Sequence, residues 1–512
     1  MLYVSVAGSI LLIALVTLAF LLLAMFIFTS ILPAAALFVL PSIAAQNKTS
    51  TSGKVDINWH APNATDVNNL ETVINGTGVY GFIFNSSQLP NGTKYGTYNW
   101  CNMPHIRTQE YPRANEEYQL EYVEVIHRHH KRTLYQDNCF PKESYPWYCS
   151  DEGLFYYGEP IKPSGNVSSP IYWSVYTTSN NPFAPSGFNG TCQFPQITRS
   201  GLDDSWQHGR DLYDVYYGLL NFLPSSLNST KVTYRVTNNV ITSEVAGMLI
   251  SAMYPSTQKG ITPVLIQPDS IDSLEPAYSC SDADDLYSSY GEGSSAANWT
   301  VHLKESQSLY DTLDSISGVD TSSSAWHDWW DHYFDNLSSR QCHGKTLPCK
   351  IGNSSRCINQ DEANEVYRLG EYEYSFIYRD SPKSLQASTA SFGVWIGELA
   401  QNFRDSVSGA SILIYRHNVA HDGSIARLLS ILQVDKMVWP GMGSEIVFEL
   451  YSKKGESHTR YVRILWGGQV FRSSNPSLGL VDMLDLSILL EYFDSLVGVK
   501  GEKISGLCGE KS

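Results

Sequence analysis

Charged side chains are scarce in this 512-residue chain, at 17% of positions, and none occurs between residues 2 and 47. Basic residues are in the minority, with 35 Lys and Arg against 51 Asp and Glu, which gives a net charge of −16. A protein that binds a phosphate backbone needs a basic surface, so this balance argues against a nucleic-acid partner. Hydrophobic residues make up 43% of the chain, which is enough for a large buried core.

The uncharged N-terminal stretch predicts contact with a membrane. Residues 2–28 are long enough to span a bilayer, which takes about 20 apolar residues. Alternatively, a chain begun at Met25 would carry a signal peptide of ordinary length, cleaved after the small-x-small sequence of residues 42–44. We therefore expect residues 1–45 to be a signal peptide or an N-terminal membrane anchor. The remainder is then either secreted, or displayed as a membrane-anchored luminal or extracellular domain.

The nine cysteines lack the CxxC pairs that are typical of zinc sites. In an oxidising compartment they predict disulfides, with one cysteine left over because their number is odd. Short loops make Cys139–Cys149 and Cys342–Cys349 plausible pairs, although the sequence does not fix the connectivity.

Asn-x-Ser/Thr sequons are frequent after the uncharged stretch and predict N-linked glycans. They occur at Asn47, Asn63, Asn75, Asn85, Asn91, Asn166, Asn189, Asn228, Asn298, Asn336 and Asn353.

Changes in composition and hydrophobic periodicity predict an α/β protein with an inserted helical region. The expected segments are the leader at 1–45, a glycosylated N-terminal segment packed on the core at 46–118, the first part of an α/β domain at 119–255, a mainly helical insertion at 256–389, and the second part of the α/β domain at 390–512. Strands are expected at 120–126, 232–236, 411–415, 445–451 and 460–466, and helices at 201–222 and 423–432.

A dense basic run, Arg128-His129-His130-Lys131-Arg132, follows the first expected strand. Open α/β sheets bind ligands at the carboxyl ends of their strands. Two arginines beside an imidazole can bind phosphate through charge-assisted hydrogen bonds, and their charge favours a neutral His129. A neutral imidazole nitrogen can attack phosphorus and form a covalent phosphohistidine.

Residues 128–134, Arg-His-His-Lys-Arg-Thr-Leu, resemble the R-H-G-x-R-x-P signature of the histidine acid phosphatases, the phytase-containing branch of the histidine phosphatase superfamily. His421-Asp422 resembles the family's second signature, an H-D pair that opens a helix, and residues 197–224 resemble its intervening helical region. The resemblance implies a three-layer α/β/α domain with a mainly helical inserted cap, and hydrolysis of small phosphomonoesters at acid pH without a metal or other cofactor. It also implies that His129 is the nucleophile and Asp422 the proton donor, and that Arg128, Arg132 and His421 bind phosphate.

Three family positions differ in this chain. The family's glycine is His130 and its proline is Leu134, so a bulky ring stands where close backbone approach is usual. A further pocket arginine of the family aligns with Asn239 or Ile241, and Arg235 is a possible substitute for it.

Two other interpretations remain open at this stage. One is a catalytically silent glycoprotein of the same fold that acts as a binding or scaffold protein. The other treats the basic run as a solvated charge cluster, or as a metal site built from His127, His129 and His130, although the neighbouring arginines would repel a cation.

Overall fold

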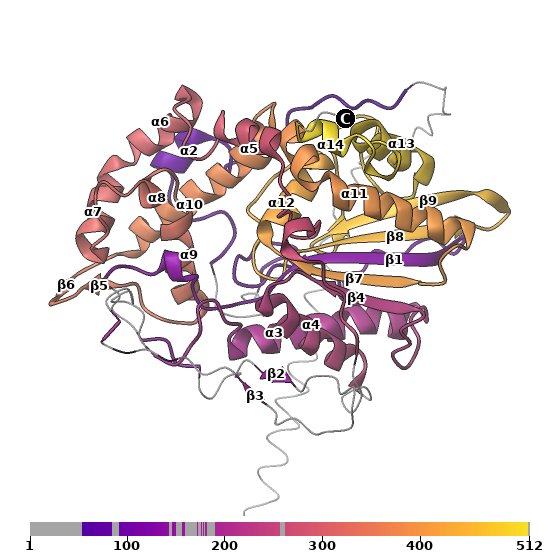
Figure 1. Ribbon diagram of the computed structural model, residues 1–512, viewed down its shortest axis with the longest axis horizontal. Coiled ribbons are helices and arrows are strands. Elements are labelled where there is room, and N and C mark those ends of the chain that lie inside the picture. The colour runs from indigo at the N-terminus through magenta and orange to yellow at the C-terminus, as the bar shows by residue number, and fades with distance from the viewer. Residues whose placement is uncertain are drawn as a thin grey trace, which may run out of the picture. The chain divides into compact units, whose positions relative to one another are not determined.

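The core of the protein is a mixed seven-stranded sheet, seen in a computed structural model (Figure 1). The structure describes residues 54–509 except 84–91, 143–145, 150–155, 159–170, 173–175, 177, 179, 182–189 and 256–261. The expected leader at 1–45 lies outside these residues. From Val55 onwards the chain forms one compact unit.

The strand order is β10-β9-β8-β1-β7-β4, with β11 paired to β9. The strands are β1 (Tyr118–Arg128), β4 (Val232–Val236), β7 (Tyr415–Ala420), β8 (Glu445–Lys453), β9 (Glu456–Trp466), β10 (Gln469–Val470) and β11 (Leu484–Asp485). β7 runs parallel to both β1 and β4, whereas β8 runs antiparallel to β1. The carboxyl ends of β1, β7 and β4 therefore meet at one edge of the sheet.

Successive side chains of β1 face opposite sides of the sheet, and both sides are covered by helices. Val123 and Val125 pack in one apolar cluster, and Tyr122 and Ile126 pack in another. Figure 1 shows α3 and α4 on one side of the sheet and α11, α12 and α13 on the other. These helices are α3 (Arg199–Tyr213), α4 (Val240–Met253), α11 (Ser384–Ser408), α12 (Asp422–Ile431) and α13 (Leu486–Val497). The three-layer α/β/α prediction is confirmed.

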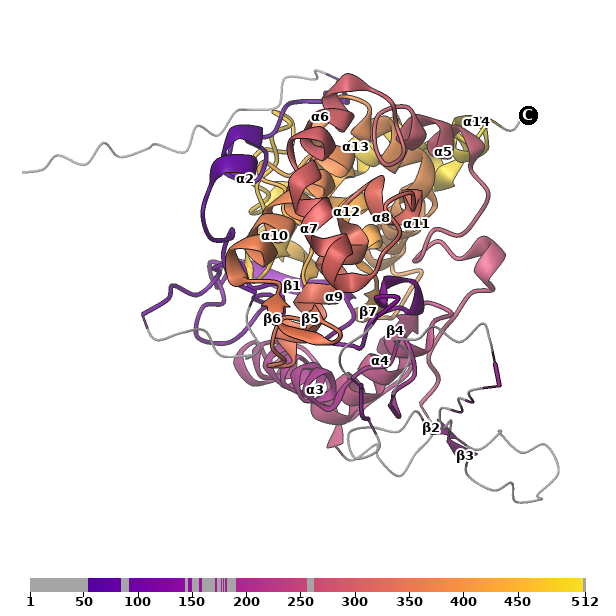
Figure 2. The same ribbon diagram turned by 90° about the vertical axis from the view of Figure 1, so that its left-hand side faces the viewer.

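A second, largely helical region has an apolar core of its own, rich in aromatic rings. Figure 2 shows α6, α7, α8 and α10 grouped together, with the β5–β6 hairpin beside them. Its elements are α6 (Ala297–Glu305), α7 (Gln307–Ser317), α8 (Ser324–His327), α9 (Asp331–Cys342), β5 (Cys349–Lys350), β6 (Asn353–Cys357) and α10 (Gln360–Ser375). We call this region the helical insertion. From the N-terminal segment, α2 (Leu70–Asn75) packs on α10.

Short elements complete the described chain. They are β2 (Tyr156–Gly158), β3 (Ile171–Tyr172), α5 (Ser281–Ser288), α14 (Ile504–Leu507), the 3-10 turns η1 (Gln136–Asn138), η4 (Asp269–Ile271) and η6 (Val499–Gly501), and the π-helical turns η2 (Asp214–Leu219) and η5 (Phe376–Asp380).

Most expected elements are present, but the strand expected at 411–415 is wrong in its position. The observed strand β7 begins at Tyr415 and continues to Ala420. Its residues Arg416, His417 and Asn418 are polar, although His417 and Asn418 are buried. A search for runs of apolar residues therefore misses this strand. The helix expected at 201–222 is also shorter, because α3 ends at Tyr213 and continues as the π-helical turn η2.

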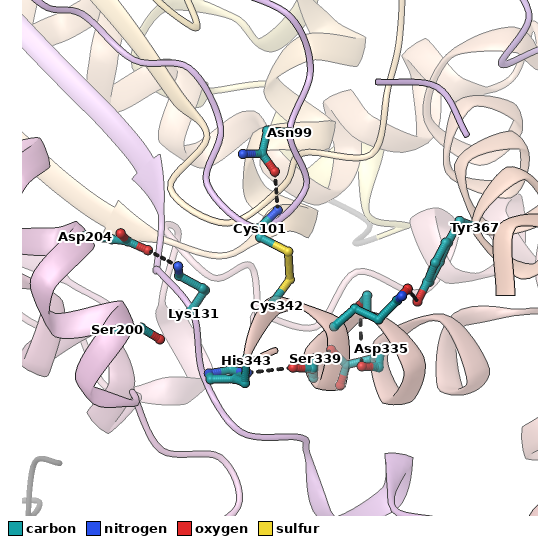
Figure 3. The surroundings of a disulfide bond; sticks show 12 residues. Asn99, Cys101, Lys131, Ser200, Asp204, Asp335, Ser339, Cys342, His343 and Tyr367 are labelled. Atoms are coloured by element: carbon teal, nitrogen blue, oxygen red, sulfur yellow. Dashed lines mark hydrogen bonds and ion pairs between the residues drawn. A yellow bond between two sulfur atoms is a disulfide. The ribbon is translucent and has the colours of Figure 1, made fainter. Parts of the chain in front are cut away.

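The structure contains four disulfides, which confirms the prediction of disulfide bonding but not the suggested partners. They are Cys101–Cys342, Cys149–Cys192, Cys280–Cys508 and Cys349–Cys357. Cys139 is the cysteine left over, and it is buried. Figure 3 shows the first of these bonds at the end of α9, the helix that also carries Asp335. Two of the bonds join residues more than 200 positions apart, so proximity in sequence was no guide to pairing.

The predicted glycan acceptors differ in exposure. Asn336 lies inside α9 with no exposed surface; its amide donates to the Asn138 carbonyl at 2.8 Å. The prediction of a glycan at Asn336 is therefore wrong for the folded chain. The acceptors with exposed side chains are Asn63, Asn75, Asn228, Asn298 and Asn353. Those outside the described residues are Asn47, Asn85, Asn91, Asn166 and Asn189.

Within the described part of the chain, every helix is too short or too polar to cross a membrane.

Candidate active site

The carboxyl ends of β1 and β7 bring the two sequence signatures together. Arg128 pairs with Ala420 in the parallel ladder, and the His129 N–H donates to the Ala420 carbonyl at 3.0 Å. His421 follows directly as the residue that precedes α12. As a result, the rings of His129 and His421 lie 5.4 Å apart between centroids.

His129 is held in a definite tautomer. Its Nδ1 lies 2.9 Å from the backbone carbonyl oxygen of His130, so Nδ1 donates a hydrogen and Nε2 keeps its lone pair. Burial lowers the pKa of His129 well below its usual range, and the charges of Arg128 and Arg132 lower it further. The imidazole is therefore neutral, which a nucleophile for phosphorus requires.

Arg128 is buried beside the histidine and is bonded on two sides. Its Nη1 donates to the Pro440 carbonyl at 2.6 Å, and its Nη2 lies 3.1 Å from Oδ2 of Asp422. The guanidinium also covers the ring of Trp100 at 4.7 Å. Its Nε has no hydrogen-bond partner among the described residues, which leaves one buried donor for an oxyanion.

Arg132 is held by the helical insertion. Its Nη1 lies 3.2 Å from Oδ2 of Asp335 on α9 and donates to the Thr133 carbonyl at 2.9 Å. Its Nε, like that of Arg128, has no partner within the described chain. No sequence motif marks Asp335, which lies 203 residues from Arg132 and reaches the site only through the fold.

Asp422 is the first residue of α12, where its Oδ2 accepts from the Trp439 indole at 2.9 Å as well as from Arg128. Burial raises its pKa, but the charge of Arg128 and the bond from Trp439 outweigh burial and hold the pKa below its usual value. A phosphate dianion bound beside Asp422 would raise this pKa. Without that dianion, Asp422 is a carboxylate.

His421 reaches two groups that the sequence did not single out. Its Nε2 lies 2.9 Å from the Thr237 hydroxyl, just beyond the end of β4, and 3.2 Å from Glu275. No local motif marks Thr237 or Glu275, because both are defined only by the convergence of strands at this edge.

The three residues of uncertain role, His130, Arg235 and Asn239, have hydrogen-bond partners other than the residues of this cluster. The His130 ring lies beside His208, with Nε2 to Nδ1 at 3.1 Å, so it does not crowd His129. Arg235 points toward α11 and is bonded to Glu398 at 2.7 Å. Asn239 caps α4 by accepting from the Ile241 N–H at 3.3 Å, and Ile241 is fully buried in apolar packing. Arg235, the one proposed substitute, is therefore engaged elsewhere and does not supply the further arginine.

Comparison with known proteins agrees with this geometry. Residues 119–466 match the model of the histidine phosphatase superfamily (branch 2), and the chain therefore belongs to that family. Counting factor 60 of Dictyostelium discoideum is 20% identical over 69% of this chain and 80% of its own length. The 2-phosphoxylose phosphatase 1 of Rattus norvegicus is 21% identical, over 72% and 75%. A solved phytase from Hafnia alvei in complex with tartrate covers 75% of this chain and 98% of its own, at 11% identity and a TM-score of 0.49.

Proposed function

We propose that the protein is a secreted, glycosylated acid phosphatase that hydrolyses small phosphomonoesters through a phosphohistidine on His129. One observation carries the proposal: the neutral imidazole of His129, with a lone pair on Nε2, lies near two buried arginines, and the Nε–H of each arginine has no hydrogen-bond partner among the described residues. Such donors bind tetrahedral oxyanions and stabilise charge that develops on them.

The reaction proceeds in two displacements. Nε2 of His129 attacks phosphorus, the ester P–O bond breaks, and the leaving alkoxide takes a proton from Asp422. Because Asp422 is a carboxylate in the free protein, it first acquires that proton when the phosphoester binds beside it, which occurs more readily at acid pH. Water then attacks the phosphohistidine, Asp422 accepts a proton, and inorganic phosphate leaves with His129 restored.

A steady-state assay tests this function. We expect the purified protein to hydrolyse an aryl phosphate faster at pH 5 than at pH 7.5, and we expect His129→Ala to remove that activity. His458→Ala, on the exposed part of β9, is the matched histidine control and should retain it. Hydrolysis by His129→Ala at the wild-type rate would exclude the mechanism. Phosphorylated sugars belong in the substrate panel because of the relative named 2-phosphoxylose phosphatase.

A catalytically silent binding or scaffold protein is the second candidate. It is favoured by the ion pair of Arg132 with Asp335, which occupies part of the phosphate clamp, and by the missing further arginine. One relative is also named as a counting factor rather than as an enzyme. Oxyanion binding without turnover of any phosphomonoester would support this candidate.

A further inference from the structure

Three histidines cluster on the face of β1 opposite Arg128. His127 is on β1, His130 follows the strand, and His208 is on α3; all three have no exposed surface. One ring nitrogen from each lies within 4.8 Å of the other two. We call these residues the tri-histidine cluster.

Hydrogen bonds fix which nitrogens are free. Nδ1 of His127 donates to the Arg128 carbonyl at 2.8 Å, so its Nε2 carries a lone pair. Nε2 of His208 donates to Oε2 of Glu445 at 2.9 Å, so its Nδ1 carries one. Backbone carbonyls and carboxylates are the groups that commonly orient metal-binding histidines from behind.

The distances suit a tetrahedral divalent ion. Nε2 of His130 and Nδ1 of His208 are 3.1 Å apart, close to the roughly 3.3 Å between two nitrogens that share a zinc at about 2.0–2.1 Å each. The ligand nitrogens of the three histidines lie up to 4.8 Å apart, which is farther than two nitrogens that share one ion. At least one ring must therefore turn inward when an ion binds.

A protein-only account leaves buried polar atoms unpaired. With one proton shared between His130 and His208, Nε2 of His127 has no hydrogen-bond partner among the described residues; Nδ1 of His130 also has none, but it stays unpaired when Nε2 of His130 binds an ion. Buried polar atoms normally have one, and a lone pair on a buried imidazole is satisfied equally well by a metal ion.

Nearby positive charges are neutralised by partners of their own. Arg128 is paired with Asp422 on the far face of the sheet. The Lys131 ammonium lies 2.8 Å from a carboxylate oxygen of Asp204, and Figure 3 shows these two side chains pointing toward one another. Glu445 accepts a hydrogen bond from His208, so a carboxyl group lies directly beside the cluster. These pairs reduce the repulsion that the basic run would exert on an ion at this face of β1, and His105, which stacks on His208, is itself paired with Asp211.

We propose that the tri-histidine cluster binds one zinc-class divalent ion, at a site separate from the phosphoryl-transfer site. The ion joins β1 to α3, and through Glu445 to β8. It also fixes His130, whose carbonyl sets the tautomer of His129. His130 is then a metal ligand and, through His129, a positioning residue. Gly443 makes room for its ring, since a Cβ there would come within 2.4 Å of it.

Metal content and spectroscopy test the proposal on the whole protein. After chelation and dialysis, we expect Zn²⁺ and Co²⁺ each to bind at one ion per chain and to raise the midpoint of thermal unfolding. The Co²⁺ form should show the visible absorption bands of a tetrahedral site, and X-ray absorption of the Zn²⁺ form should show three imidazole nitrogens at about 2.0–2.1 Å. These measurements need only the wild-type chain.

Variants locate the ion. His127→Gln and His208→Gln should each lose at least tenfold in Zn²⁺ affinity, whereas His343→Gln in the helical insertion should bind as the wild type does. His129→Ala should also retain binding, which separates this proposal from the phosphatase proposal. Failure of folded wild-type protein to bind Zn²⁺, Co²⁺ or Ni²⁺, or retention of full affinity by both cluster variants, would overturn it.

Discussion

At the scale of single residues, each arginine of the candidate site already has a carboxylate partner. Arg128 is paired with Asp422, and Arg132 with Asp335. An incoming phosphate must therefore share these guanidinium groups with a carboxylate or displace it. The unpartnered Nε–H of each arginine makes sharing feasible, because a guanidinium has five donors in a fixed fork. We therefore expect the carboxylate partners of the two arginines to weaken phosphate binding.

The pair of Arg132 and Asp335 gives the first prediction. Asp335→Asn removes a charge that competes with phosphate, so competitive inhibition by inorganic phosphate should tighten roughly tenfold, in line with the strength of one hydrogen bond to a charged group. Breaking a buried pair also costs stability, about 3 kcal/mol by urea unfolding.

Asp331→Asn on the same helix is the matched control. Burial raises the pKa of Asp331 well above its usual value, which favours the neutral carboxyl, so the amide changes the charge of this side chain less than it does at Asp335. An equal change of phosphate affinity in both variants would show that Asp335 does not compete for the clamp.

The second prediction concerns Asp422 and pH. Its folded-state pKa lies below the usual value, so its contribution to stability is present above the unfolded pKa of about 3.9 and is lost as pH falls through the folded pKa. The free energy of unfolding of Asp422→Asn should fall below that of wild type by about 3 kcal/mol at pH 6, and the difference should shrink below pH 3.

The control for this pH dependence is Asp285→Asn on the exposed side of α5. It should leave the free energy of unfolding within about 0.5 kcal/mol of wild type at both pH values. A cost for Asp422→Asn that is as large at pH 2 as at pH 6 would contradict the ion pair with Arg128.

At the scale of elements, the alternation of side chains along β1 decides what each residue can do. Ile126 and Arg128 face α11 and α12, whereas Val125 and His127 face α3. One strand thus contributes to the candidate active site on one side and to the tri-histidine cluster on the other. The basic run could be placed at the end of β1 from its apolar periodicity. The division of its side chains between two faces depends on which helices cover each face, and therefore on the fold.

The close approach of α3 to the basic run gives the third prediction. A Cβ on Gly201 would lie 2.0 Å from the Lys131 carbonyl oxygen, so Gly201→Ala must push α3 away from the residues that follow His129. We expect a loss of about 1–3 kcal/mol in the free energy of unfolding and a fall in kcat.

Gly247→Ala on the exposed side of α4 is the matched glycine, because its Cβ would meet nothing within 4 Å. It should be neutral or stabilising by up to about 1 kcal/mol, since alanine favours the helix. Equal stability of the two variants in thermal or denaturant unfolding would contradict the close contact of α3.

At the scale of the whole molecule, the fold joins parts that the sequence keeps far apart. The core of the candidate site was predictable because Arg128, His129, Arg132 and the pair at 421–422 form local motifs at strand ends. Asp335 was not predictable, since it comes from the helical insertion and carries no motif of its own. The disulfide partners were hidden for the same reason. Two cysteines pair when the fold brings them close together in space. Among the four disulfides, only Cys349–Cys357 joins residues that are also close in sequence.

The long-range disulfides give the fourth prediction. Removing Cys280–Cys508, which closes a separation of 228 residues, should destabilise the protein more than removing Cys349–Cys357, with a separation of 8. A chain-entropy model puts the difference at roughly 3 kcal/mol. Paired alanine variants, compared by denaturant unfolding, measure it. Equal losses would mean that native-state contacts, and not loop closure, dominate the stabilisation.

The central claim is that His129 becomes phosphorylated during turnover. The direct measurement is rapid denaturation of the protein in alkali during reaction with a ³²P-labelled phosphomonoester, followed by peptide mapping, because the P–N bond survives alkali and not acid. The account predicts acid-labile label on the peptide that contains His129, none in His129→Ala, and wild-type labelling in His458→Ala. Turnover without label at His129, or label that persists in His129→Ala, would contradict it.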